Sequence, residues 1–274
     1  MDNYNQRDKK FNEIIIDGFK LFINNFIRIF PIFLIFLSIG IIIKVFSLTE
    51  INYQLIIIQD QLGENLVNAE FILLYFGAIF LEFLIMNLFI ILAISLVSLY
   101  LYKRYTNQEA NYTKDLKKTI NKNLVFILLI LGIGVPFSMI LIIPGLLIYG
   151  YYIFSIFTFN IPEIKKPLSK AKEISEGYKR RIIIIFLIGL LIIFSGNIIN
   201  NLFLADTYES LIISRNYGEL IIHFFICNLI GIILSPLIIC LLTPLFSSCY
   251  NSYKADIENK KSSSAEETLK RKKK

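Results

Sequence analysis

The chain is short of the residues that most enzymes use in catalysis. It has one histidine, His223, and no tryptophan among 274 residues. A single histidine excludes a two-histidine metal site, and the sequence contains no glycine-rich phosphate loop, no HExxH and no GxSxG. We therefore predict no catalytic site, no metal site and no cofactor, and we expect that the protein is not an enzyme.

Cysteine is also scarce. Cys227, Cys240 and Cys249 all fall in or just after the last apolar run. Their spacing matches no zinc motif and no evident disulfide. We predict that they serve as small apolar packing residues.

Apolar residues, in contrast, make up 55% of the chain, and the mean hydropathy is +0.64. Several apolar runs are longer than about 18 residues, the length typical of a membrane-spanning helix. Six spans are predicted, at about 29–46, 71–102, 124–143, 146–161, 182–205 and 220–246. The first run is long and has no small-residue cleavage site after it, so we expect a retained span and not a signal peptide.

A polar or amphipathic stretch precedes each pair of spans. Residues 11–26 place apolar and polar side chains on opposite faces, which is typical of a helix lying in the membrane interface. Residues 105–123 and 167–181 are predicted to form similar helices. Pro144-Gly145 is predicted to form the turn between the third and fourth spans, and Gly132, Gly134 and Pro136 predict a kink or a close helix approach within the third.

The predicted fold is therefore an all-α polytopic membrane domain over residues 1–253. It has six transmembrane helices in three hairpins, each preceded by a cytoplasmic interfacial amphipathic helix. Residues 254–274 are charged and serine-rich and are predicted to form a disordered basic cytoplasmic tail. The order of elements allows a threefold repeat over 11–102, 105–161 and 167–253, but any six-span protein with cytoplasmic loops before its odd spans would show the same order.

Lysine and arginine predict the orientation, because they resist translocation across the membrane. Residues 1–28, 102–123, 161–181 and 254–274 hold five, six, seven and eight of them, whereas the three intervening connections hold one, none and one. This alternation predicts a multi-pass protein of the cell (cytoplasmic) membrane with both termini in the cytoplasm.

Polar side chains within the predicted spans form one candidate site. Glu82 is costly inside a bilayer, and such a residue usually marks function. If the second, fifth and sixth spans are neighbours, six side chains can meet in the outer leaflet: Glu82, Asn197, Asn200, Asn201, His223 and Asn228. The cluster is either a proton- or substrate-binding cavity or a set of interhelical hydrogen bonds with a protonated Glu82.

The stretch before the fifth span is a second candidate site. Anionic lipid headgroups are the expected partners of its basic residues, Lys165, Lys166, Lys170, Lys172, Lys179, Arg180 and Arg181. The alternative is that these residues only fix the topology. The net charge is +7. In a soluble domain this charge would suggest nucleic-acid binding, but here the basic residues lie beside membrane spans, so we expect no nucleic-acid partner.

The stretch from Pro144 to Arg181 resembles the membrane domain associated with some glycerophosphoryl diester phosphodiesterases, and related stand-alone six-helix membrane proteins. The resemblance rests on Pro144-Gly145, an aromatic-rich run ending near Pro162-Glu163, and Ala171, Ser175 and Gly177. It covers about forty residues. It implies a membrane-embedded accessory domain, since the phosphodiesterase chemistry of that family belongs to a separate soluble barrel, and no catalytic residue carries over.

Two functions stay open at this point. The first is a non-enzymatic membrane protein that contacts lipids, a membrane protein partner or a second copy of itself, in envelope or lipid homeostasis. The second is a small-solute or proton-coupled transporter that uses Glu82 and the asparagines, with its third and sixth spans broken by glycine and proline. An intramembrane enzyme comes third, because it needs a second acid or a nucleophile near Glu82 or His223.

Overall fold

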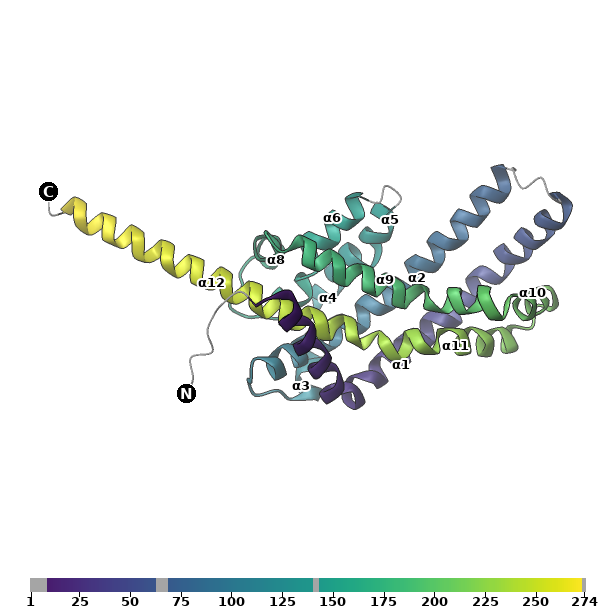
Figure 1. The fold of residues 1–274 in the computed structure, drawn as a ribbon, viewed down its shortest axis with the longest axis horizontal. Helices are drawn as coiled ribbons and strands as arrows, with labels where there is room; N and C mark the ends of the chain where they lie inside the picture. Colours follow the sequence, from purple (N-terminus) through teal and green to yellow (C-terminus); the bar gives the residue numbers. More distant parts are fainter. Residues whose placement is uncertain (1–8, 63–68, 140–142, 273–274) are drawn as a thin grey trace.

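The computed structural model describes residues 9–62, 69–139 and 143–272, and the regular structure in these ranges is helical, without a β-strand. The all-α prediction is therefore confirmed. Two long helices begin the chain, α1 (Phe11–Leu62) and α2 (Ala69–Tyr105), and they pack against each other as a hairpin (Figure 1).

The middle of the chain is built from short helical pieces, most of which pack against α2. They are α3 (Tyr112–Thr119), α4 (Lys122–Ile127), the π-helix η1 (Leu128–Gly134), α5 (Val135–Met139), α6 (Ile143–Tyr152) and α7 (Ser155–Thr158). Asn111 caps α3, and the buried Asp115 of α3 binds Lys103 of α2 at 2.6 Å. This ion pair fixes α3 against the end of α2.

The π-helix has a specific cause and a specific partner. Pro136 lacks an N–H, so the carbonyls about one turn before it lose their usual donor. The buried side chain of Asn87, on α2, donates to Leu131 O at 2.8 Å and Gly132 O at 3.1 Å. A Cβ on Gly132 would lie 2.8 Å from the Leu88 side chain, so the predicted close approach of helices at this glycine is confirmed.

The last part of the chain completes the bundle. It contains α8 (Pro167–Ser175), α9 (Lys179–Phe203), α10 (Ala205–Ser214), α11 (Tyr217–Leu234) and α12 (Pro236–Lys272). α11 and α12 pack against α1, and α9 packs against both of them. Gly177 joins α8 to α9 with φ of +88°, a conformation that glycine adopts without strain.

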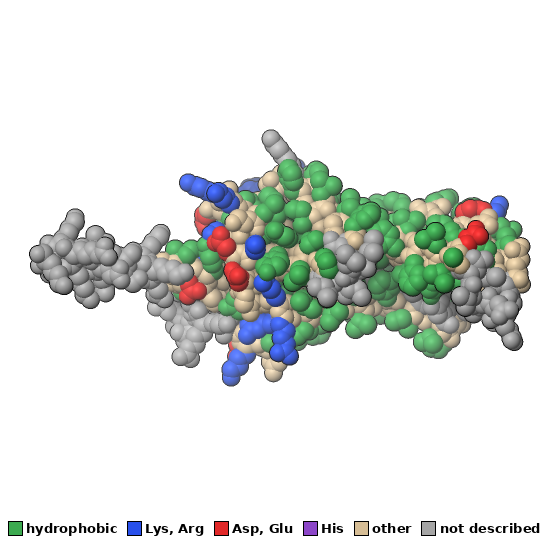
Figure 2. Space-filling model, turned by 90° about the horizontal axis from the view of Figure 1, so that it is seen from above, with side chains coloured by type: hydrophobic (Ala, Val, Ile, Leu, Met, Phe, Trp, Pro, Cys, Tyr) green, Lys and Arg blue, Asp and Glu red, His purple; other side chains and the backbone are tan. Residues whose placement is uncertain are grey.

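Three helical runs in the described residues are long and apolar enough to cross a membrane: Phe11–Gln61, Ala69–Tyr105 and Tyr217–Glu258. A fourth crossing is added if α3 and the run 123–137 form one bent span. Large apolar side chains such as Ile27, Leu73 and Phe203 are more than 70% exposed on the outside of the bundle. In Figure 2, hydrophobic side chains cover most of the visible face, and most lysines and arginines gather toward one end. These features suit a membrane protein.

The first helix differs from the prediction of an interfacial helix, a span and a loop. α1 runs without interruption through all three, and it changes direction in its N-terminal half (Figure 1). Pro31 lies inside α1, and proline is a usual cause of such a bend. α1 continues as a helix beyond Thr49 because Leu48 and Leu55 are buried against Ala78 of α2. Gly63, the predicted turn, lies outside the described residues.

One proline prediction also needs correction. Pro144 and Gly145 do not form the turn between the third and fourth predicted spans but lie in the first turn of α6, where a missing N–H costs least. The sixth predicted span lies within the long helical run Tyr217–Glu258, in which α11 ends at Leu234 and Pro236 starts α12. The fourth predicted span corresponds to α6 and α7.

The C-terminal tail also differs from the prediction. Residues 254–274 are predicted to be disordered, but the structure continues α12 through Lys272. Alanine, glutamate, lysine and leucine are good helix formers, so a helix anchored by the buried stretch before Tyr250 can propagate outward. The three predicted repeats are not alike in detail, because only the second and third begin with a separate short helix.

The basic end of the bundle is tied together at Lys9. Its ammonium group binds Asp17 at 2.6 Å and the Tyr105 hydroxyl at 2.8 Å, and its carbonyl accepts from Arg181 at 3.1 Å. Burial alone would lower the pKa of Lys9, but the bonds to Asp17 and Tyr105 outweigh it and raise this pKa to about 12. The contact therefore holds its charge at any physiological pH.

Candidate functional site: a cavity around Lys44 and Glu82

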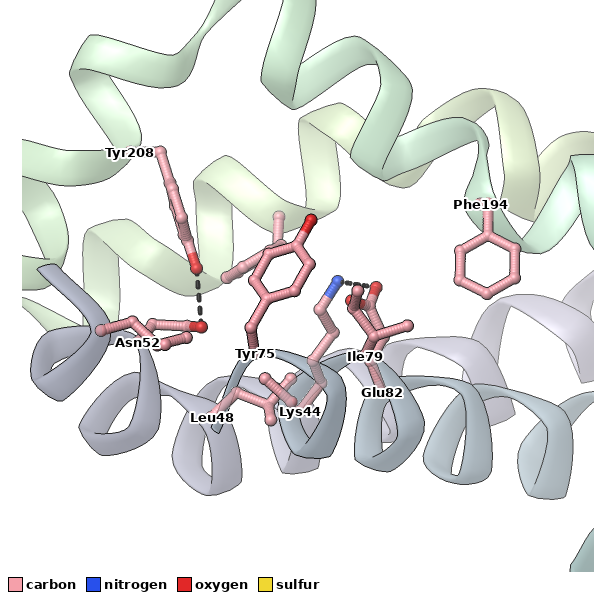
Figure 3. Close-up of a pocket in the computed structure, with 11 residues that line it drawn as sticks. Lys44, Leu48, Asn52, Tyr75, Ile79, Glu82, Phe194 and Tyr208 are labelled. Atoms are coloured by element: carbon pink, nitrogen blue, oxygen red, sulfur yellow. Dashed lines mark hydrogen bonds and ion pairs between the residues drawn. The ribbon is translucent and has the colours of Figure 1, made fainter. Parts of the chain in front are cut away.

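A cavity of about 340 Å³ includes Tyr208 of α10 in its wall. α10 lies at one end of the bundle in Figure 1, and most visible lysines and arginines gather toward the other end in Figure 2. Five helices contribute to its wall: α1, α2, α9, α10 and α11 (Figure 3). The wall consists of Lys44, Leu48, Asn52, Leu55, Tyr75, Ala78, Ile79, Glu82, Phe194, Tyr208 and Phe224.

An ion pair forms part of the wall of this cavity. The Lys44 ammonium donates to the Glu82 carboxylate, and the two side chains are only 2% and 12% exposed. The ammonium also lies 4.3 Å from the centre of the Phe224 ring, a cation–π distance. Charges this deep need such partners, because an ion removed from water without compensation costs several kcal/mol.

A polar group of tyrosine and asparagine side chains lies beside the ion pair. Asn52 donates to the Tyr208 hydroxyl at 2.7 Å, and the Tyr75 ring stands between this bond and Lys44 (Figure 3). The Tyr208 ring is also stacked on His223, with centroids 5.9 Å apart. The cavity is therefore charged at one side, hydroxylic at the other and aromatic between them.

The structure distributes the six predicted cluster residues among different surroundings. Glu82 lines the cavity, and His223 is buried behind Tyr208. Asn228 is also buried, but its amide donates to Phe224 O in its own helix at 2.8 Å. The side chains of Asn197, Asn200 and Asn201, all on α9, lie outside the described part of the structure.

Lys44 is the residue that the sequence prediction missed. The charge count assigns Lys44 to the connection after the first span, although it stands within an apolar run between Ile43 and Val45. A lysine between isoleucine and valine in an apolar run indicates a charge buried within a span. Such a charge needs a counter-charge on a neighbouring helix. With Glu82 already conspicuous on the next helix, the pair was accessible from the sequence.

The predicted headgroup residues also fall into two groups. Lys170 is bound within the protein, to Glu173 at 2.7 Å and to the Tyr253 hydroxyl, and Arg181 holds the backbone of Lys9. The bond to Lys170 lowers the pKa of Glu173. Outward-facing positive charge remains on the exposed residues Lys165, Lys166, Lys172 and Arg180. Lys179 is half-buried, and its ammonium donates to the Tyr151 hydroxyl at 2.6 Å.

No group of three histidine, cysteine, aspartate or glutamate residues gathers in the described ranges in a way that can hold a metal ion. Cys227, Cys240 and Cys249 are buried and in no disulfide, in agreement with their predicted packing role. No family model, no curated protein and no solved structure matches the chain. The family resemblance of residues 144–181 therefore stays a prediction based on those residues alone.

Proposed function

We propose that the chain is a six-span protein of the cell membrane that contacts lipids through its basic cytoplasmic end and acts as an accessory protein without catalysis. The separation of charge supports this proposal: most of the visible lysines and arginines gather toward one end of an apolar body (Figure 2). Beyond the three long helical runs, the remaining crossings would be α4 to α5, α6 with α7, and α9.

The topology is tested by cysteine labelling in intact cells with a membrane-impermeant maleimide. Asn107→Cys, between α2 and α3, should be protected until the cells are opened, whereas Ser210→Cys, on α10, should label at once, because the basic end faces the cytoplasm. Both positions are exposed, and the native cysteines are buried. Labelling of both positions, or of Asn107→Cys alone, in intact cells would contradict the proposed orientation.

Lipid contact is tested by native mass spectrometry of protein extracted gently from its own membrane. We expect retained anionic phospholipid, and we expect the K165Q/K166Q/R180Q variant to lose most of it, because each basic side chain near an anionic surface contributes about 1 kcal/mol.

The matched control is K114Q/K117Q/K118Q, which removes the same charge from α3. Equal lipid loss in both variants would show that net charge matters and the α8 region does not. Wild-type protein that carries no anionic lipid would contradict the proposed contact.

The second candidate, a small-solute or proton-coupled transporter, is favoured by the cavity around Lys44 and Glu82. Its decisive variant is Glu82→Gln, which keeps the shape of the side chain and removes the charge. In proteoliposomes we expect this variant to abolish solute or proton flux if the cavity is on a transport path. Wild-type proteoliposomes without flux, or a variant with full flux, would leave the lipid-contact function as the one supported.

A further inference from the structure

The ion pair in the cavity limits which ligands can enter. Lys44 and Glu82 neutralise each other and are nearly buried. A simple anion that bound Lys44 would compete with Glu82 and leave the cavity with an excess negative charge. A simple cation that bound Glu82 would leave the cavity with an excess positive charge. Either case places an uncompensated charge in a site shielded from water, which is costly.

A ligand that carries both charges avoids this cost. Its anionic group can bind the Lys44 ammonium while its own ammonium binds the Glu82 carboxylate. Four alternating charges then replace two, and the net charge of the site stays zero. The Lys44 ammonium can keep its place over Phe224, so the pair needs to open only slightly.

The cavity also offers hydrogen-bonding groups that the fold does not use. The Tyr208 hydroxyl oxygen accepts a hydrogen bond from the Asn52 amide, so its own O–H stays available as a donor. Within the described ranges, the Tyr75 hydroxyl and the Asn52 amide oxygen make no hydrogen bond, and both residues line the cavity. These groups line the same cavity as Lys44, and of them Tyr75 stands nearest to it in Figure 3, so they are available to the oxygens of an anionic group that binds Lys44.

The size of the cavity sets an upper limit on the ligand. At about 340 Å³, it is at the lower end of the range of about 300–1,000 Å³ that is usual for small-molecule sites. It suits a headgroup or a small metabolite, whereas acyl chains would have to stay outside.

We propose that this cavity binds a small zwitterion, in which an ammonium and a phosphate or carboxylate are joined by a short linker. Such chemistry occurs both in the headgroup of an aminophospholipid and in free zwitterionic solutes. The site does not depend on the proposed lipid contacts of the basic end, which lies at the opposite end of the bundle.

The test measures the affinity of the purified full-length protein for three soluble probes by calorimetry. Glycerophosphoethanolamine carries both charges, glycerol 3-phosphate only the negative one, and ethanolamine only the positive one. We expect the first to bind and each of the others to bind at least about 30-fold more weakly, the loss typical of a buried charge left without its partner. Equal binding of all three, or no binding of the zwitterion in any form, would overturn the proposal.

A parallel measurement separates the two sources of the ligand. Protein in nanodiscs of phosphatidylethanolamine and phosphatidylglycerol is released and analysed by native mass spectrometry. Retained phosphatidylethanolamine points to a lipid headgroup, and binding of glycerophosphoethanolamine alone points to a free solute. Either result supports a zwitterion site, and retention of phosphatidylglycerol alone contradicts it.

Three variants connect the binding to the cavity. Glu82→Gln should abolish zwitterion binding, and so should K44M/E82L, in which both charges are replaced by apolar side chains and no unpaired ion is left to disturb folding. Arg215→Gln, which breaks the exposed pair with Glu50 at the same end of the bundle, should bind as the wild type does. Wild-type affinity in K44M/E82L would overturn the assignment.

Discussion

Replacing Glu82 by alanine is expected to destabilise the protein by about 3–5 kcal/mol, because the substitution leaves the Lys44 ammonium buried without its counter-ion. Lys44 is 2% exposed. Its remaining attraction to the Phe224 ring replaces only part of the lost pairing. The free energy of unfolding in mixed micelles, measured by reversible titration with denaturing detergent, should show the change.

Two variants determine whether the loss comes from the unpaired charge. K44M/E82L should regain most of the stability, since apolar residues of similar size often replace a buried ion pair without loss. Arg215→Gln should change the free energy of unfolding by less than about 1 kcal/mol, because both members of the Glu50–Arg215 pair are exposed. If K44M/E82L is as unstable as the alanine variant, shape and not charge is the cause.

Replacing Gly231 by alanine should separate α9 from α11. A Cβ at this position would lie 2.8 Å from Ile192 O and 2.9 Å from the Ser195 hydroxyl oxygen. The nearest atom belongs to the backbone, so no side-chain rotation can make room. Overpacking of this kind costs about 1–3 kcal/mol and more when backbones must move apart, and it should lower the midpoint of thermal unfolding.

Gly77 provides the matched control for this experiment. It lies in α2, and a Cβ there would meet nothing within 4 Å. Gly77→Ala should therefore be neutral or should stabilise the helix by about 0.5–1 kcal/mol. Equal stability of the Gly231 and Gly77 variants would show that α9 and α11 do not approach as closely as the structure places them.

The sequence predicts those elements of the fold that local patterns decide. The helix at 167–175 illustrates this, because it lies within the predicted 167–181, Pro167 begins it, and its apolar residues Ala171 and Ile174 are buried. The continuity of α1 was not predictable in this way. It depends on the contact of Leu48 and Leu55 with Ala78, which belongs to another helix.

The candidate site was predictable in part for the same reason. Glu82 stands out because a carboxylate within an apolar run is unusual, whatever surrounds it. Its neighbours in the cavity come from five helices, and residues such as Tyr208 and Asn52 carry no sequence signal that connects them. Only the packing of α10 against α1 and α11 brings their polar atoms together.

The contact of Asn87 with η1 has a consequence for biosynthesis. On the proposed membrane disposition, the segment with Pro136 enters the bilayer carrying carbonyls that its own helix does not satisfy, and lipid offers them no donor. The donor is on α2, which precedes η1 in the chain and so has left the ribosome first. We therefore expect the α1–α2 hairpin to be the template on which the later segment is inserted.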